Sequence, residues 1–422
     1  MTRYEDLPEA DFDAETGRCP FAMIADRQPT CPVMRLTSDN PERNVLLVTG
    51  STQVLDVIGD AETFSSRGHP QARRFDSDFD PQAAAIFAER GQDLKNVIVW
   101  SDGADHARIR KLVQRAFSPP EVRKKEPYLR AMIDGLIDEF AAGGTIDFGD
   151  AFAWRLPTRV ITREFGLPDD LVPLVHDVTN KVAMMLDPLG ETGAAIAAAS
   201  AISDLHDVLM GKLAHIDELP DNTLLKQLAL ARGDAQGGEG ALTTDELRWL
   251  ATILLVAGGH TTTAMLGWAL YMLALHPEIQ DRLRADPSGI ELFVEEVLRL
   301  HGPVPTSYRT ATRDTRIGDV DVPAGTWVLV RWDAINLDPA RFDDPERFDP
   351  ERPNVRKHST FGHGKHFCIG NVLGRTELRL TLEAMLARFS SIRLGAPQDE
   401  ILPIPTFDVH MLQNLPLTLI PM

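Results

Sequence analysis

A glycine-rich loop surrounds the cysteine at position 368. Residues 361–370 read Phe-Gly-His-Gly-Lys-His-Phe-Cys-Ile-Gly, with three glycines in this stretch. Glycine lets a backbone turn tightly and approach a flat ligand closely. A helix is expected over Ile369–Phe389, so Cys368 stands at a helix N-terminus, where partial positive charge favours the thiolate. Amides there can donate hydrogen bonds to the sulfur, as a sulfur ligand of iron requires.

Two other interpretations of this cysteine remain open. A single cysteine is most often a small buried apolar residue. His363, His366 and Cys368 also supply part of a zinc site, although no fourth ligand follows at a usual spacing. The glycine pattern favours the iron ligand over both.

The loop resembles the haem-binding signature of the cytochrome P-450 family, Phe-Gly-x-Gly-x-His-x-Cys-x-Gly, at every fixed position. Other motifs of the family occur in the same order between positions 106 and 368. The resemblance implies haem b (iron protoporphyrin IX) as the cofactor and Cys368 as its iron ligand. It also implies a mainly α fold with a small β region, with the haem buried between a long central helix and the helix after the cysteine loop.

Four basic side chains match the family's contacts to the haem propionates. His106 and Arg110 are four residues apart, so they share a helix face and can point at one carboxylate. Arg309 and His366 match the other contacts. The two carboxylates of haem would be buried without partners if such donors were absent.

A second motif, Glu-x-x-Arg, occurs at Glu296 and Arg299. Residues three apart face the same side of a helix and can pair. Arg347 matches the third member of the family's charged network. Because a buried charged cluster is costly unless each group is paired, we expect these three residues to hold the cysteine loop in place.

A long helix is expected to carry the oxygen chemistry. A capping box at 243–246 and the proline at 277 predict a helix of about 33 residues, roughly 50 Å long. Its centre, Ala-Gly-Gly-His-Thr-Thr at 257–262, resembles the family's Ala-Gly-x-Asp/Glu-Thr-Thr. The paired glycines are expected to let the helix open locally. By resemblance Thr261 bonds oxygen or a nearby water, although a threonine that bonds its own helix carbonyl is common.

His260 departs from the family, which has a carboxylate at this position. An imidazole titrates near neutrality and can carry protons. We expect His260 to keep the proton relay and to shift its pH dependence. The alternative is an inert His260 with a slow or peroxide-driven relay.

The substrate pocket is expected on one face of the long helix. Small and aliphatic side chains there favour a small apolar organic substrate, although the same pattern is typical of a protein core. The expected lining, besides Thr261, is Ile253, Val256, Ala257, Val304 and Met411.

The remaining pattern is that of one mainly helical domain over residues 1–422, with an irregular segment at 1–40 and an exposed loop at 233–240. Other strands and helices are expected from apolar periodicity and turn residues. The expected helices are Glu121–Phe140, Ala194–Ile216 and Ile290–Leu300, and the expected strands are Asn44–Val48, Arg316–Val322, Thr326–Trp332 and Leu415–Ile420.

Charge limits the partners of the protein. The net charge of −19 disfavours nucleic acid and anionic membranes, which bind basic surfaces. Seven basic residues nevertheless lie in the strip Arg108–Lys125, which suggests the docking of an acidic partner or simply a solvated helix face. Polar residues at the centre of the long apolar helix argue against a membrane span. Three cysteines and an acidic N-terminus without a signal peptide pattern predict a cytoplasmic protein, with Cys19 and Cys31 as free thiols.

We therefore expect a haem-thiolate monooxygenase that inserts one atom of O2 into an apolar substrate, by hydroxylation or by O- or N-dealkylation. No flavin or ferredoxin domain is recognisable, so the resemblance implies a separate ferredoxin and reductase, with the ferredoxin at the basic strip. A peroxide-driven oxygenase of the same fold and a non-catalytic haem-thiolate sensor are the alternatives.

Overall fold

The structure is a computed structural model of the chain. It describes residues 2–10, 31–36, 45–68, 75, 80–93, 97–186, 193–231, 241–404, 406 and 408–422. The expected exposed loop at 233–240 and Cys19 lie outside these residues, whereas Cys31 is a free thiol as expected.

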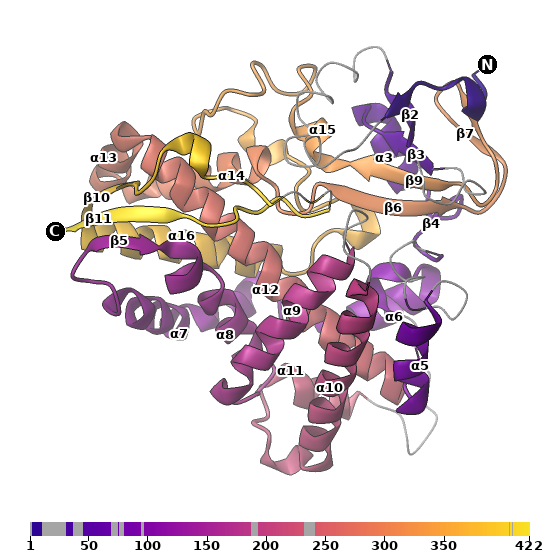
Figure 1. Cartoon of the computed structure of the whole chain (residues 1–422), viewed down its shortest axis with the longest axis horizontal. Coiled ribbons are helices and arrows are strands. Elements are labelled where there is room, and N and C mark those ends of the chain that lie inside the picture. Colours follow the sequence, from indigo (N-terminus) through magenta and orange to yellow (C-terminus); the bar gives the residue numbers. More distant parts are fainter. Residues whose placement is uncertain are drawn as a thin grey trace.

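Helices make up most of the molecule, and small sheets lie on opposite sides of them (Figure 1). The expected mainly α fold with a small β region is confirmed. The helices are α3 Ser51–Gly59, α5 Pro81–Glu89, α6 Gly103–Val113, α7 Pro119–Asp138, α8 Arg155–Glu164, α9 Val172–Leu186, α10 Ala194–Ala214, α11 Leu224–Leu230, α12 Thr244–Leu275, α13 Pro277–Ala285, α14 Ile290–Leu300, α15 Trp332–Asn336 and α16 Asn371–Arg388.

The strands form three sheets, with the orders β1-β2-β3-β9-β6-β4, β10-β11-β5 and β7-β8. Most neighbouring strands are antiparallel, but two pairs, β1 with β2 and β3 with β9, are parallel. The strands are β1 Glu9–Ala10, β2 Val33–Leu36, β3 Val45–Val48, β4 Phe64–Ser65, β5 Gly144–Asp147, β6 Thr306–Ala311, β7 Thr315–Ile317, β8 Val320–Val322, β9 Trp327–Arg331, β10 Phe389–Leu394 and β11 Pro416–Pro421.

Two expectations about the β region were wrong in detail. The stretch Arg316–Val322 is a hairpin of β7 and β8 rather than one strand, because Gly318 turns the chain at a φ of 57°. The N-terminal segment expected to be irregular contains β1 and β2, which extend the main sheet beside β3.

The long helix α12 runs through the middle of the molecule and packs against α8, α9 and α16 (Figure 1). Its capping box forms as expected: the amide of Glu246 donates to the Thr243 hydroxyl at 3.2 Å, and the Thr243 amide donates to the Glu246 carboxylate at 2.9 Å. It ends at Leu275, two residues before the proline. Although α12 is long and apolar enough to cross a bilayer, 61% of its most apolar window is buried inside the protein. It therefore serves as the core helix.

Candidate active site

Two cavities meet between α12 and the cysteine loop. The first, of about 210 Å³, is lined by Cys368 and by Thr261 of α12. The second, of about 330 Å³, extends along α12 and includes His260. Residues common to both linings are Thr261, Val304, Ser307, Arg309 and His366. A group held in the first cavity would thus face the second chamber across Thr261.

The cysteine loop is held by its own backbone. Gly362 and Gly364 have φ angles of 73° and 68°, a conformation that side chains rarely adopt, so both positions favour glycine. The amide of Cys368 donates to the carbonyl of Phe361 at 2.9 Å, which closes the loop. The helix that follows the loop, α16, lies close to α12. A Cβ at Gly374 of α16 would lie 3.8 Å from the hydroxyl oxygen of Thr262.

Cys368 is accessible from the first cavity, and protein groups surround its sulfur. Burial raises the pKa of the thiol, whereas hydrogen bonds from the amides of Gly370 and Asn371 and the charges of Arg110 and Arg375 act in the opposite direction. The sequence predicted that the helix N-terminus lowers the pKa of this thiol, but burial outweighs that effect. A metal cation at the sulfur would supply the missing stabilisation, because coordination deprotonates a thiol.

Three of the four basic residues assigned to the propionates surround the cysteine loop. The rings of His106 and His366 lie 4.1 Å apart, and Arg110 Nη2 donates to the carbonyl of Phe367 at 2.7 Å. His366 Nε2 lies 3.6 Å from Asp102 Oδ1. Burial and the charges of His366 and Arg110 lower the pKa of His106 to about 4, so His106 is a neutral hydrogen-bond partner near pH 7.

Arg309 is a buried cation that faces both cavities. Its side chain is 7% exposed and donates to the neighbouring carbonyl of Tyr308 at 2.6 Å. Among the residues that the structure describes, no carboxylate lies within ion-pair distance of it. Burial lowers its pKa only to about 10, so the guanidinium remains charged. A buried cation that faces a cavity without a counter-ion fits an anionic group of a ligand.

The pair Glu296–Arg299 ties α14 to the segment before the cysteine loop. Arg299 Nε and Nη2 donate to the two Glu296 oxygens at 2.7 and 2.8 Å, and both side chains are fully buried. Arg299 Nη1 also donates to the carbonyls of Asn336 and Pro345 at 2.8 and 2.7 Å. The expected pairing of these two residues is present.

Arg347, however, is not the third charged member of this network. Its guanidinium is 64% exposed and pairs with Asp349 at 2.9 Å. Only its carbonyl takes part, as an acceptor for Arg299 at 3.3 Å. The assignment of Arg347 was wrong because its side chain turns outward.

Arg352 occupies the place expected for that third residue. Its side chain is 6% exposed, and its Nε lies 3.5 Å from Glu296 Oε1. The sequence repeats Asp-Pro-Glu-Arg at 344–347 and 349–352, and the second copy is the one whose arginine turns inward. From the sequence alone, this repeat makes Arg352 as good a candidate as Arg347 for the third member of the network.

The glycines of α12 serve close packing rather than an opening of the helix. The helix is continuous through both of them. A Cβ at Gly258 would lie 3.2 Å from Ile161 Cγ1 of α8, and one at Gly259 would lie 3.5 Å from Thr179 Cγ2 of α9. The expected local opening is therefore not present.

Thr261 and His260 follow these glycines. Thr261 Oγ1 donates to the carbonyl of Ala257 at 2.8 Å, so the oxygen can still accept a hydrogen bond in the cavity. Burial, together with the charge of His176, lowers the pKa of His260 to about 4. The expectation of an imidazole that titrates near neutrality was wrong, because the site is desolvated.

The second cavity contains four of the five residues expected to line a substrate pocket: Ile253, Val256, Ala257 and Val304. Met411 does not line it, and Asp408 and Val409 do instead. The periodicity of α12 could not identify the residues that other elements contribute to the wall of this cavity. These additional residues include Phe75, Val97, Trp100, Met185 and Ile202.

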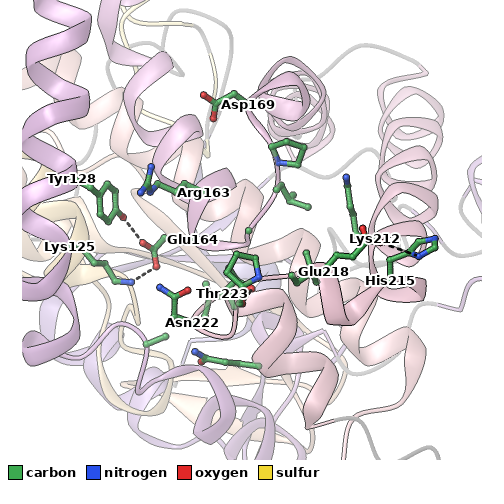
Figure 2. Close-up of a pocket in the computed structure, with 18 of the residues that line it drawn as sticks. Lys125, Tyr128, Arg163, Glu164, Asp169, Lys212, His215, Glu218, Asn222 and Thr223 are labelled. Carbon is green, nitrogen blue, oxygen red and sulfur yellow. Dashed lines mark hydrogen bonds and ion pairs between the residues drawn. The ribbon is translucent and has the colours of Figure 1, made fainter.

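A larger cavity, of about 1010 Å³, shares no lining residue with these two. Figure 2 shows Lys125 and Tyr128 of α7 pointing to Glu164, which pairs with both of them. Lys125, at the end of the basic strip, therefore turns into this cavity and is partnered there.

The zinc interpretation of the cysteine loop loses its support. Among the described residues, no three His, Cys, Asp or Glu side chains come together as a metal site. A metal bound at Cys368 would need its other ligands from a cofactor, as the iron of a porphyrin has.

Comparisons with known proteins give a consistent result. The sequence model described as Cytochrome P-450 matches residues 175–288 and 290–419. The chain is 30% identical to the 6-deoxyerythronolide B hydroxylase of Saccharopolyspora erythraea over 99% of this chain and 100% of that protein. It is 32% identical to the cytochrome P-450 monooxygenase PikC of Streptomyces venezuelae, over 93% and 91% of the two chains. A solved structure of the cytochrome P-450 enzyme CxnD, for C–S bond formation in chuangxinmycin biosynthesis, superposes with a TM-score of 0.86 at 29% identity and 99% coverage of both chains.

The two copies of the Asp-Pro-Glu-Arg repeat provide a matched test of the buried network. Arg352→Met removes a donor to Glu296 and the hydrogen bonds from Arg352 to the carbonyls of Asp343 and Asp344, so we expect the free energy of unfolding to fall by about 1–3 kcal/mol. Arg347→Met removes an exposed pair and should change it by less than about 0.5 kcal/mol. Urea unfolding measures both, and equal losses would contradict the role of Arg352.

Proposed function

Since this chain belongs to the cytochrome P-450 family of monooxygenases, we propose that it inserts one atom of O2 into a small apolar organic substrate. The reaction would be a hydroxylation or an O- or N-dealkylation. The observation that carries this proposal is the arrangement of the Cys368 thiol and Thr261 around two joined cavities.

The donors around the first cavity support haem b as the cofactor. Cys368 would ligate the iron, and the four basic residues His106, Arg110, Arg309 and His366 would hold the propionates. The buried cation of Arg309, which Asp102 stabilises only from beyond ion-pair distance, fits this role, because a propionate could pair with it directly. When bound, the haem supplies the oxygen-activating chemistry, and thiolate ligation favours cleavage of the O–O bond.

The chain's own residues orient the substrate and handle protons. Thr261 already donates its proton to Ala257, so its oxygen is free to accept a hydrogen bond from water or substrate. His260 is neutral near pH 7 and can accept a proton at one nitrogen while it releases one at the other. Apolar side chains such as Val256 exclude water from the same chamber.

The second cavity supports a small and mainly apolar substrate. Its volume of about 330 Å³ lies at the lower end of ligand pockets. Aliphatic and aromatic side chains form most of its wall, while Thr306, Tyr308 and Asp408 provide a polar edge. The two hydroxylase and monooxygenase relatives support C–H oxidation as the reaction class.

A peroxide-driven oxygenase is the second candidate, and the histidine at position 260 is what favours it. His260 stands where the family has a carboxylate. If its neutral imidazole does not pass protons on, proton delivery to the site is slower. A non-catalytic sensor is disfavoured by the presence of Thr261 in the chamber.

An acidic ferredoxin is the proposed electron donor, at part of the basic strip. Arg108 pairs with Glu246, and Arg110 is bonded to the loop, so these cations are already used. Lys111, Arg115 and Arg123 are exposed, and no ion pair of theirs occurs within the described part of the chain. These three form the proposed docking cations, steered by charge. We place the protein in the cytoplasm as one haem domain, where such a partner would meet it.

Turnover with labelled oxygen tests the proposed reaction. A screen of apolar compounds for a spin-state change in the haem spectrum first provides a substrate. With ferredoxin, reductase, NADH and ¹⁸O₂, the product should carry one labelled atom from O2. Formation of product from hydrogen peroxide alone, with none from NADH, would favour the peroxide-driven candidate.

Replacement of His260 tests the proton relay. Because burial places its pKa near 4, the imidazole is neutral in the folded protein above that pH, and its contribution should be constant between about pH 6 and pH 8. His260→Ala should lower product formed per NADH by about tenfold or more across this range. His260→Asp, which restores the family's carboxylate, should recover coupling. Equal coupling in the wild type and His260→Ala at every pH would exclude the relay.

The salt dependence of reduction tests the docking site. Lys111→Glu and Arg115→Glu should each slow reduction by ferredoxin several-fold at low salt, with the difference shrinking as salt screens the charges. Arg316→Glu, a charge change on the β7–β8 hairpin away from the strip, is the control and should leave the rate unchanged. Rates that depend on neither salt nor these cations would rule out this surface.

A further inference from the structure

A buried ion pair that the proposed reaction does not use lies behind the cysteine loop. Glu295 of α14 is 2% exposed, although its neighbour Glu296 already forms the structural network. Arg375 of α16 holds it in a bidentate contact, with Nε and Nη2 at 2.6 and 2.9 Å from the two carboxylate oxygens. This pair joins the helix before the loop to the helix after it.

A neutral histidine completes the pair. His358 Nε2 lies 2.9 Å from Glu295 Oε2, and the amide of Thr360 donates to His358 Nδ1 at 3.3 Å. Since Nδ1 accepts, Nε2 carries the proton and donates to Glu295. Burial lowers the pKa of His358, so the imidazole stays neutral.

The charges of the pair are therefore one carboxylate and one guanidinium. Burial raises the pKa of Glu295, but the hydrogen bonds from His358 and Arg375 outweigh it and bring the pKa to about 2. Glu295 is ionised near pH 7. Arg356, at 3.9 Å, is the other cation near Glu295 and is more than half exposed.

Arg375 reaches both sides of the loop that presents the sulfur. Its guanidinium carbon lies 4.2 Å from the ring centroid of Phe361, in a cation–π contact. Its Nη1 lies 3.2 Å from Asn371 Oδ1, and Asn371 Nδ2 donates to the carbonyl of Cys368 at 2.8 Å. The carbonyl of Phe361 in turn accepts from the Cys368 amide. The guanidinium is therefore fixed beside the two chain segments that hold the cysteine.

The two charges act unequally on the sulfur. Arg375 contacts Phe361 and Asn371 of the loop, so its positive charge lies on the loop side of the pair, whereas Glu295 contacts Arg375 and His358 behind it and offsets only part of that charge. In a partly buried site an additional positive charge favours the reduced, more negative state of a metal centre.

We propose that Arg375 and Glu295 are positioning residues that set the reduction potential of the haem, with Arg375 raising it and Glu295 both fixing Arg375 and offsetting part of its charge. The inference rests on the proposed haem at Cys368 and adds a regulation of that site. His358 keeps Glu295 oriented without adding a charge of its own.

The reduction potentials of variants in which one charged side chain is replaced by a neutral one test this directly. Arg375→Gln should lower the equilibrium constant for reduction on the order of tenfold, equivalent to about 59 mV for one electron. Glu295→Gln should shift the potential in the opposite direction. Arg375→Lys, which keeps the charge near the loop, should stay closer to the wild type than Arg375→Gln does.

Arg379→Gln is the matched control, because this arginine lies one turn along α16 and pairs with Glu126 and Glu383 instead of the loop. It should shift the potential by less than either test variant. If Arg375→Gln and Glu295→Gln shift the potential in the same direction, or by no more than the control does, the inference is overturned. If Arg375→Gln fails to fold, Glu295→Gln still decides: a potential above that of the wild type supports the inference, and one at or below it overturns the inference. A wild-type chain without a thiolate-ligated haem would instead refute the proposed function itself.

Discussion

The position of one sulfur atom constrains the rest of the structure. Cys368 lies against a cavity that faces the middle of α12, and it is held there by a loop with a single turn of 3-10 helix, Gly364–His366. Two left-handed glycines and one backbone hydrogen bond shape this loop, but they do not anchor it to the remainder of the protein. Buried charges on α14 provide that anchor.

The consecutive residues Glu295 and Glu296 divide this task. Glu296 binds Arg299 and Arg352 and so fixes the chain that leads to the loop, whereas Glu295 binds Arg375 and fixes the helix that leaves it. Buried ion pairs contribute little net stability, because desolvation offsets most of the attraction. Their directional hydrogen bonds instead specify one geometry of the loop, as the proposed metal ligand Cys368 would need.

The sequence predicted the elements that local chemistry determines. The capping box and the proline predicted α12, and the glycine pattern predicted the tight loop before Cys368, in which Gly362 and Gly364 have positive φ angles. What it could not predict depended on tertiary packing. Nothing local distinguishes the outward Arg347 from the inward Arg352. The pKa of His260 depends on its burial and on His176 of α9, and the cavity lining beyond α12 comes from distant segments. The paired glycines of α12 were misread because close packing and local opening need the same residue.

The most direct test of this account is the absorption spectrum of the reduced carbon monoxide adduct of purified protein, expressed with ample iron and porphyrin precursor. We expect the red-shifted band of a haem ligated by a thiolate, and its loss in Cys368→Ser. A colourless protein, or a carbon monoxide adduct without the red-shifted band in the wild type, would contradict the assignment of Cys368 and the site built around it.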